Sequence, residues 1–283
     1  MKQSLKNSHK FDVSIIIVSY NTKFLTLQCI KSVIRSIKKL KYEIIVIDNA
    51  STDGSAYAIG NYLSSISFPD LKIVENKRNL GFAKANNQGI NIACGKYVLL
   101  LNSDTKIKNN ALEEMVALAK NNTDTGAVGP RLLNIDGSIQ PSVYRLPTLD
   151  RAIKQYWLGE KNILDKYFPD SKKPTAVESL VMAAFLITPK ALKKVGLLDE
   201  RYFMYYEDLD YCRRLQKNKL KIFYLPCAEV FHYHGASGDS ETTDNKKWHR
   251  LIPSSKIYHG LFVHYVFNFV IWSSQKLKKN FCR

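Results

Sequence analysis

The sequence predicts an α/β fold in which helices cover both faces of a doubly wound, mostly parallel central sheet. Three observations predict this class. Apolar runs typical of buried strands alternate with segments of helical periodicity over residues 13–130. Several of these runs end in polar residues, as the strands of such a sheet do where a ligand binds. The chain has 283 residues and is 45% apolar, which is enough for a large buried core.

The first half of the chain carries the clearer pattern. The run VSIIIV at residues 13–18 predicts a buried strand, and Leu27, Ile30 and Ile37 follow it at helical spacing. A second buried strand is predicted at residues 43–47, and further strands are predicted at residues 72–75, 97–101 and 126–130. Helices are predicted after the turn at residues 53–54, at residues 83–93 and at residues 111–120.

The second half is less regular, and we expect it to pack on the same domain. A loop is predicted at residues 137–149, and a basic, aromatic segment that begins as a helix at residues 151–174. A strand at residues 178–188 precedes a helix that begins near Pro189 and ends before Gly196. A second helix at residues 207–218 and strands at residues 220–225 and 229–233 complete this half.

The charge of the chain predicts an anionic partner. The net charge is +17, and residues 246–283 contain eight Lys or Arg and no Asp or Glu. The same segment is rich in aromatic residues, including Trp248, Tyr258, Phe262 and Trp272. We expect a helical extension that contacts an anionic membrane surface. Nucleic acid, or a helix packed on the core with a solvated lysine face, would also fit this composition.

The cysteines and the chain ends predict a cytoplasmic protein. The five cysteines form no CxxC pair and are odd in number, so we expect reduced thiols and no zinc site. Residues 1–12 lack the apolar core of a signal peptide. The apolar run at residues 261–272 is shorter than the ~20 residues that a membrane span requires. We therefore expect peripheral contact with a membrane and no crossing of it.

Three polar clusters are candidates for chemistry. Asn102, Ser103 and Asp104 follow a buried strand, and their oxygens suit Mg²⁺ or Mn²⁺, although such residues also form ordinary turns. Glu207, Asp208 and Asp210 crowd the first turn of a helix, where acids complement the helix dipole or serve as a general base. His232 or His234, before a glycine turn, could add a metal-binding nitrogen.

A fourth cluster, NKRNLGFAKANNQG at residues 76–89, combines positive charge, amide groups and a glycine before a helix. These groups suit a diphosphate. The alternative is a polar loop that caps a helix. The segment matches neither the dinucleotide fingerprint nor the Walker A loop, so it does not indicate a dinucleotide oxidoreductase or a P-loop ATPase.

Five segments occur here in one order: VSIIIVSYN, IIVIDNASTDGS, NLGFAKANNQGI, YVLLLNSDT and RYFMYYEDLDYCRRL followed by VFHYHGASG. Together they closely resemble the family 2 glycosyltransferases of GT-A fold, especially the branch containing bacterial rhamnosyltransferases for surface polysaccharides. The similarity covers residues 12–238. It implies one GT-A domain at residues 1–238, with a nucleotide-binding half at 12–130 and an acceptor half at 131–238. Residues 239–283 are then the basic extension.

The resemblance implies an inverting transfer from a nucleotide-diphosphate sugar to a hydroxyl of a glycan or lipid-linked acceptor, with Mn²⁺ or Mg²⁺ as the cofactor. It assigns Asp208 as the general base and Asp104 as the main metal carboxylate, with Asn102 and His232 beside it. It assigns the remaining residues to donor binding: Tyr20, Asn21, Asp48, Asn49, Arg78, Gly81, Phe82, Asn86, Asn102 and Ser103.

Two other functions remain open on the sequence. A nucleotidyltransferase uses a similar sheet and metal-binding carboxylates, but it would more typically have a glycine-rich phosphate loop where this chain has VSYNTKFLTL. A non-catalytic nucleic-acid-binding protein is favoured by charge alone. That reading explains neither the polar strand ends nor the acidic cluster, so we expect no nucleic-acid partner.

Overall fold

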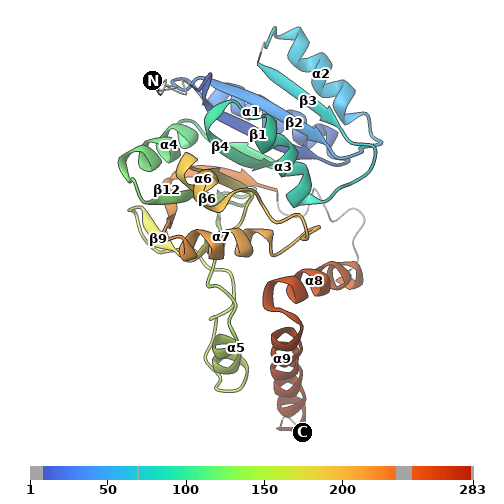
Figure 1. The fold of residues 1–283 in the computed structure, drawn as a ribbon, viewed down its shortest axis with the longest axis vertical. Helices are drawn as coiled ribbons and strands as arrows, with labels where there is room; N and C mark the ends of the chain where they lie inside the picture. The colour runs from blue at the N-terminus through green and yellow to red at the C-terminus, as the bar shows by residue number, and fades with distance from the viewer. Residues whose placement is uncertain (1–8, 69, 234–243, 282–283) are drawn as a thin grey trace, which may run out of the picture.

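A mixed β-sheet forms the centre of the molecule (Figure 1). The structure is a computed structural model that describes residues 9–68, 70–233 and 244–281. Within these ranges the sheet has ten strands in the order β3-β2-β1-β4-β11-β6-β12-β5, with β7 added beside β6 and β9 beside β12. Both predicted halves of the domain contribute strands to this one sheet.

The first four strands of the path are parallel, as predicted. They are β1 (Phe11–Ser19), β2 (Tyr42–Asp48), β3 (Leu71–Glu75) and β4 (Gly95–Asn102). The chain adds β2 and β3 on one side of β1 and then returns to place β4 on the other side. This reversal of strand order is where open α/β sheets form ligand crevices, because the loops on the two sides part there.

The second half of the sheet is mixed. β11 (Ala184–Ile187) is antiparallel to both β4 and β6 (Thr125–Leu133), whereas β12 (Lys221–His232) is parallel to β6. Short strands complete it: β5 (Thr105–Ile107), β7 (Ile139–Gln140) and β9 (Thr175–Val177). A separate two-stranded sheet pairs β8 (Val143–Tyr144) with β10 (Ser179–Leu180).

Three predictions for this half are wrong in detail. The expected single strand at residues 178–188 is broken into β10 and β11 by a turn at residues 181–183. The two strands expected at residues 220–225 and 229–233 are one strand, β12, whose register shifts between Leu225 and Glu229. The predicted loop at residues 137–149 contains the short strands β7 and β8, because each finds a partner elsewhere in the chain.

Helices cover both faces of the sheet, as predicted for a doubly wound fold. One apolar cluster joins α1 (Lys23–Ser36), α2 (Ser55–Ser65) and α4 (Ala111–Asn121) to one face, which includes Ile15 and Ile17. A second cluster joins α3 (Phe82–Ile92), α6 (Pro189–Val195) and α7 (Glu207–Lys217) to the opposite face, which includes Ile16. Successive residues of β1 point to opposite faces, so its unbroken apolar run supplies both clusters.

Two helical segments project from the same side of this body (Figure 1). One contains α5 (Leu149–Tyr156), and the other is the C-terminal pair α8 (Asp244–His259) and α9 (Leu261–Phe281), so the extension is helical as expected. Among the described residues, no helix combines the length and the apolar character needed to cross a bilayer. The described cysteines Cys29, Cys94, Cys212 and Cys227 form no disulfide with one another.

Candidate active site

The loops that follow β1 and β2 are tied together at the carboxyl edge of the sheet. The backbone N–H of Asn49 donates to the carbonyl of Ser19 (2.8 Å), and the Asn21 side-chain oxygen accepts from the N–H of Thr52 (2.8 Å). Asn21 has a φ of 53°, which turns the chain sharply after Tyr20. The two predicted donor segments therefore form one joined surface.

Asp48 lies at the end of β2 and is almost fully buried. One carboxylate oxygen, Oδ1, accepts from the N–H of Ser51 (2.7 Å). The other, Oδ2, is buried and accepts no hydrogen bond from any residue that the structure describes. A buried carboxylate oxygen of this kind calls for a donor from outside the protein, because leaving it without one is costly.

Asn49 organises the loop at residues 76–81. Its Oδ1 accepts from the N–H of Leu80 (3.0 Å) and from Asn76 Nδ2 (3.1 Å), and its Nδ2 donates to Asn79 Oδ1 (2.8 Å). Arg78 is exposed on this loop. The side chain of Asn49 thus holds the segment that carries Arg78, and its hydrogen-bonding groups are occupied in doing so.

Gly81 brings this loop against the segment that leads into α7. Its φ of +84° is a conformation that L side chains rarely adopt, and a Cβ there would collide with the carbonyl oxygen of Phe203. The N–H of Phe82 donates to that same carbonyl (2.8 Å). Within α3, Asn86 Nδ2 donates to the Phe82 carbonyl (2.9 Å). The predicted diphosphate segment is therefore in direct contact with the chain just before the acidic cluster.

Asp104, in the turn before β5, and His232, at the end of β12, come together although they are far apart in sequence. His232 lies opposite Thr105 in the antiparallel pair of β12 and β5, which places His232 Nε2 3.5 Å from Asp104 Oδ1. Asn102 Nδ2 is also 3.5 Å from His232 Nε2. Ser103 turns inward instead, and its hydroxyl accepts from Thr22 Oγ1 (3.1 Å). His234, the alternative ligand, lies outside the described residues.

Gln140 on β7 sets the tautomer of His232. Gln140 Nε2 donates to Asn134 Oδ1 (2.9 Å), so its Oε1 faces His232 Nδ1 at 2.8 Å and accepts the ring proton there. Donation from Nδ1 leaves Nε2 as the ring nitrogen that faces Asp104 and that a metal could bind. Such outer hydrogen bonds orient histidines that bind metals.

The donor set at this point fits a divalent cation. It consists of a carboxylate, an imidazole nitrogen and the amide of Asn102, all types that Mn²⁺ or Mg²⁺ accepts alongside phosphate oxygens and water. Within the described ranges, no three His, Cys, Asp or Glu side chains gather into a group that would hold a metal by themselves. The site therefore suits a cation that a bound ligand helps to hold.

The three acids at the start of α7 have different surroundings. Asp210 forms ion pairs with Arg213 (3.0 Å) and Arg214 (2.7 Å), so it stabilises its own helix. Glu207 is buried, and its Oε2 meets no hydrogen-bond donor in the described part of the chain. Asp208 is half-buried, and its Oδ1 accepts from the N–H of Leu209 (2.8 Å).

Burial raises the pKa of both Glu207 and Asp208 above the ordinary values of 4.5 and 3.8. The charge of Asp208 raises the pKa of Glu207 further. The Leu209 N–H and the positive charge of Lys166 oppose the effect of burial at Asp208. Glu207 is therefore the acid that holds a proton, and Asp208 is the one that ionises first.

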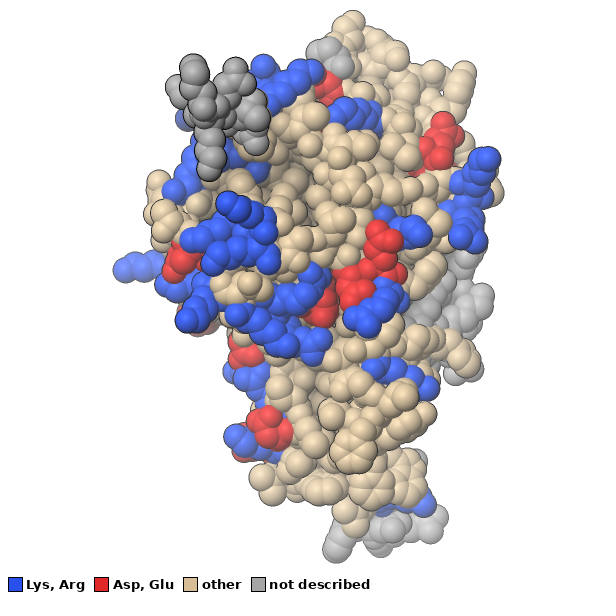
Figure 2. All heavy atoms as spheres, viewed as in Figure 1, with Lys and Arg blue, Asp and Glu red and all other residues tan. Residues whose placement is uncertain are grey.

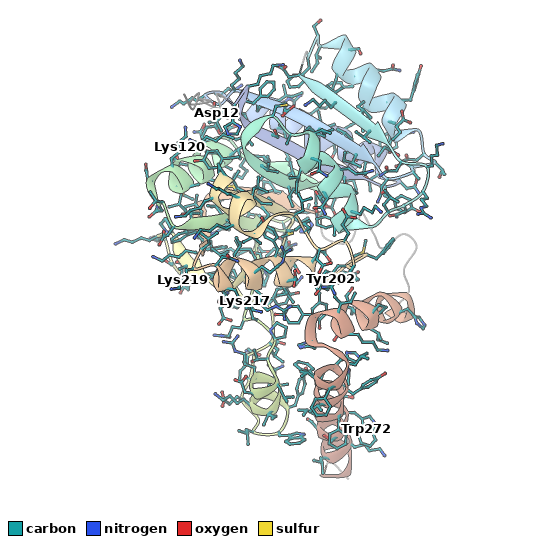
Figure 3. All side chains as sticks on the ribbon, viewed as in Figure 1. Asp12, Lys120, Tyr202, Lys217, Lys219 and Trp272 are labelled. Atoms are coloured by element: carbon teal, nitrogen blue, oxygen red, sulfur yellow. The ribbon has the colours of Figure 1, made fainter. Side chains whose placement is uncertain are left out.

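A strained turn presents these two acids. Tyr205 and Tyr206 have φ values of 71° and 69°, which are unusual for bulky residues. Strain of this kind persists only when its surroundings impose it, and it gathers at functional sites. Here α8 supplies the restraint, because Ser254 Oγ donates to the Met204 carbonyl (2.9 Å) and Tyr258 packs 5.3 Å from the Tyr206 ring. Figure 3 labels Tyr202, in the segment that leads into this turn.

Four contributors to the site were not predicted from the sequence: Gln140, Tyr144, Lys166 and Phe203. Lys166 Nζ lies 5.4 Å from the centre of the Tyr144 ring, and both residues sense the charge of Asp208. Gln140 and Tyr144 belong to strands of only two residues, and Lys166 and Phe203 belong to irregular segments. Neither kind of segment carries a periodic signal. The glycine at position 81 was the one available hint of the Phe203 contact, because a glycine before a helix permits a close approach.

Residues 14–192, more than half of the chain, match the protein-family model described as glycosyl transferase family 2. The chain belongs to glycosyl transferase family 2. Over 218 residues it is 28% identical to the N-acetylglucosaminyl-diphospho-decaprenol L-rhamnosyltransferase of Mycobacterium tuberculosis, covering 69% of this chain and 67% of the relative. Over 226 residues it is 25% identical to the low-salt glycan biosynthesis hexosyltransferase of Haloferax volcanii, covering 78% of this chain and 67% of the relative.

Two solved structures share the fold of this family 2 glycosyltransferase. The crystal structure of GalNAc-T7 with UDP, GalNAc and Mn²⁺ aligns with a TM-score of 0.64 at 18% identity, over 79% of this chain and 43% of that one. The crystal structure of residues 1–349 of S. aureus TarS aligns with a TM-score of 0.58 at 15% identity, over 92% of this chain and 69% of that one. At these identities the likenesses show the fold alone, and it is the GT-A fold that the sequence predicted.

Proposed function

We propose that this family 2 glycosyltransferase moves a sugar, with rhamnose as the first candidate, from a nucleotide-diphosphate sugar to a hydroxyl of a glycan or lipid-linked acceptor, with inversion. The observation that carries the proposal is the position of Asp208, a carboxylate with a raised pKa that follows a strained turn. Through Phe203 this turn contacts the loop of residues 76–81, the proposed donor loop. The name of the mycobacterial relative supports rhamnose and a lipid-linked acceptor.

The donor would lie along the carboxyl edge of β1, β2 and β4. Asp48 Oδ2, which accepts no hydrogen bond within the described chain, suits the ring N–H of a uracil or thymine base. Tyr20 and Asn21 border the same surface and would contact the base and ribose. Arg78 is free to reach the diphosphate, beside the helix start at Gly81 and Phe82.

Asp104, His232 and Asn102 would hold the divalent cation, Mn²⁺ or Mg²⁺. When bound, the cation supplies positive charge to the diphosphate as that group departs. Gln140 orients His232 for this role through the Nδ1 hydrogen bond. Ser103 supports the turn through Thr22 and so fixes the position of the Asp104 backbone.

Asp208 would act as the general base. Its ionised carboxylate accepts the proton of the acceptor hydroxyl while that oxygen bonds to the anomeric carbon, and the bond from this carbon to the diphosphate oxygen breaks. One displacement inverts the anomeric centre. Glu207, held neutral by burial, needs no proton exchange in this step. The positive charge of Lys166 lowers the pKa of Asp208 and so favours its ionised form.

A matched pair of variants tests the assignment. Purified enzyme is incubated with a panel of thymidine- and uridine-diphosphate sugars, with Mn²⁺, with Mg²⁺ or with EDTA, and nucleoside diphosphate release is measured. We expect metal-dependent release from one donor. We expect Asp208→Asn to lower that rate by roughly 10²–10⁴-fold, the usual contribution of a general base, without weakening donor binding.

Glu207→Gln is the control, because glutamine mimics a protonated glutamate in size and hydrogen bonding. We expect it to keep the rate within a few-fold of the wild type. A large loss in Glu207→Gln together with activity in Asp208→Asn would reverse the two roles. No release and no thermal shift with any nucleotide sugar would contradict the proposed reaction itself.

A further inference from the structure

One face of α9 carries large apolar side chains that do not pack on the protein. Phe262 is 80% exposed, Tyr265 60%, Phe269 55% and Trp272 52%. Their spacing of three, four and three residues places them on a single helical face. The opposite face is buried, with His264, Val270 and Ser274 each 5% exposed or less. We call the four exposed residues the α9 stripe.

The second projecting segment lies against α9 and adds to this surface. Trp157, just after α5, donates from Nε1 to Ser273 Oγ (3.0 Å), which fixes it beside α9. Trp157 is 48% exposed and its neighbour Leu158 is 68% exposed. Figure 3 shows Trp272 on the part of α9 that projects away from the sheet. The apolar surface is therefore at one extremity of the molecule, where it is sterically accessible.

Basic residues flank the α9 stripe. Lys276 Nζ lies 4.6 Å from the centre of the Trp272 ring, and Lys256 Nζ lies 5.5 Å from the centre of the Tyr265 ring. In Figure 2 the projecting part of the molecule is mostly uncharged, and Lys and Arg atoms appear above it and near its tip. The sequence of residues 246–283 contains eight Lys or Arg and no acidic residue.

The combination of exposed aromatic rings and flanking lysines distinguishes between two partners, a second copy of the chain and an anionic bilayer. A second copy of the chain would bring two segments of like charge together, and such an interface is disfavoured. An anionic bilayer instead offers an apolar layer to the rings and phosphate groups to the lysines. Trp and Tyr with adjacent cations suit this boundary, since their rings are amphipathic and lysine stems reach outward to the headgroups.

We propose that the α9 stripe, together with Trp157 and Leu158, docks the protein onto a bilayer that contains anionic phospholipid. Only one face of α9 enters the headgroup region, and α9 lies along the membrane surface. The lysines on its flanks contact the lipid phosphates. The proposal rests on exposure, spacing and charge, and it does not depend on which reaction the enzyme catalyses.

The test uses the full chain and a vesicle flotation assay. Vesicles contain equal parts of phosphatidylglycerol and phosphatidylcholine, or phosphatidylcholine alone. We expect binding to the anionic vesicles that weakens as salt is raised. The double variant Phe262→Ser and Trp272→Ser should bind at least ~10-fold more weakly, because it loses two rings that would be buried in the bilayer. Its thermal unfolding should match the wild type, because both side chains are exposed.

The matched control is Phe24→Ser with Tyr57→Ser, which removes two aromatic side chains that are 76% and 77% exposed elsewhere on the surface. This variant should float with the vesicles as the wild type does. Lys256→Gln with Lys276→Gln should weaken binding to the anionic vesicles and reduce its salt dependence.

Three results would overturn the proposal. One is equal flotation of the wild type and the stripe variant, and another is equal binding to neutral and anionic vesicles. The third is a wild-type dimer in sedimentation equilibrium that the stripe variant converts to a monomer, without vesicle binding by either. That result would assign the surface to self-association.

Discussion

Gly81 is the point at which the loop of residues 76–81 contacts the turn before α7, and Gly81→Ala tests whether this junction supports activity. Gly81 has φ +84° and ψ 173°, a backbone region that essentially only glycine occupies. Forcing alanine into such a region costs about 1–3 kcal/mol. The added Cβ would also push away the Phe203 carbonyl, which accepts the Phe82 N–H. Losing that hydrogen bond costs about 0.5–1.5 kcal/mol more.

The expected loss in unfolding free energy is therefore about 1.5–4.5 kcal/mol for Gly81→Ala. Gly54→Ala is the control. Gly54 also has a positive φ, +77°, but a Cβ there meets no atom within 4 Å in the described chain. It should lose about 1–2 kcal/mol from backbone strain alone. Urea unfolding followed by fluorescence measures both losses.

Activity separates the two glycine variants further. We expect Gly81→Ala to slow nucleoside diphosphate release, measured well below its unfolding midpoint, because the loop of residues 76–81 and the turn that carries Asp208 move apart. Gly54→Ala should release at the wild-type rate. The reasoning is refuted if Gly81→Ala is no less stable than Gly54→Ala, or if a destabilised Gly81→Ala keeps full activity.

Three further changes probe the acids and the turn. Lys166→Gln removes a positive charge that lowers the pKa of Asp208, so the acid limb of the rate–pH profile should move up. A solvent-screened charge interaction worth about 0.2–1 kcal/mol corresponds to a shift of about 0.1–0.7 pH units, and an unmoved limb would contradict this. The pKa of Glu207 is raised on folding, so the unfolding free energy of the wild type should fall relative to that of Glu207→Gln as pH rises above 4.5. Unfolding free energies that change with pH in parallel for the two proteins would contradict this prediction. Ser254→Ala removes the hydrogen bond to Met204 and should cost about 0.5–1.5 kcal/mol in urea unfolding while slowing the reaction; unchanged kinetics would show that α8 does not restrain the turn.

The parallel half of the sheet could be predicted because its signal is local. β1, β2 and β4 are built on apolar runs that end in polar residues, and parallel strands end at the same edge. The break between β10 and β11 could not be predicted. Its turn is made of Val181, Met182 and Ala183, which include neither glycine nor proline, and the Ala183 carbonyl accepts from the Asn102 N–H (2.8 Å) of a distant segment.

The candidate site also combines residues with a local signal and residues without one. Asp104 could be selected as a candidate from the polar turn that contains it. The position of His232 opposite Thr105 depends on the pairing of β5, a strand of three residues that gave no signal in the sequence. The C-terminal aromatics show the same limit. Tyr258 is buried against the α7 turn and Phe262 is exposed, although composition treats them alike, because only tertiary packing decides which ring is covered.

The acidic cluster at the start of α7 shows why three similar side chains need not share a role. Asp210 is neutralised by two arginines of its own helix, so its charge is committed to structure. Glu207 and Asp208 are adjacent and both desolvated, and two carboxylates so placed resist ionising together. The Leu209 N–H and Lys166 favour the ionised form at Asp208, whereas nothing comparable in the described chain reaches Glu207 Oε2. The environment thus separates the pair into an acid that holds its proton and one that ionises more readily, which is the arrangement that the proposed general-base role of Asp208 requires.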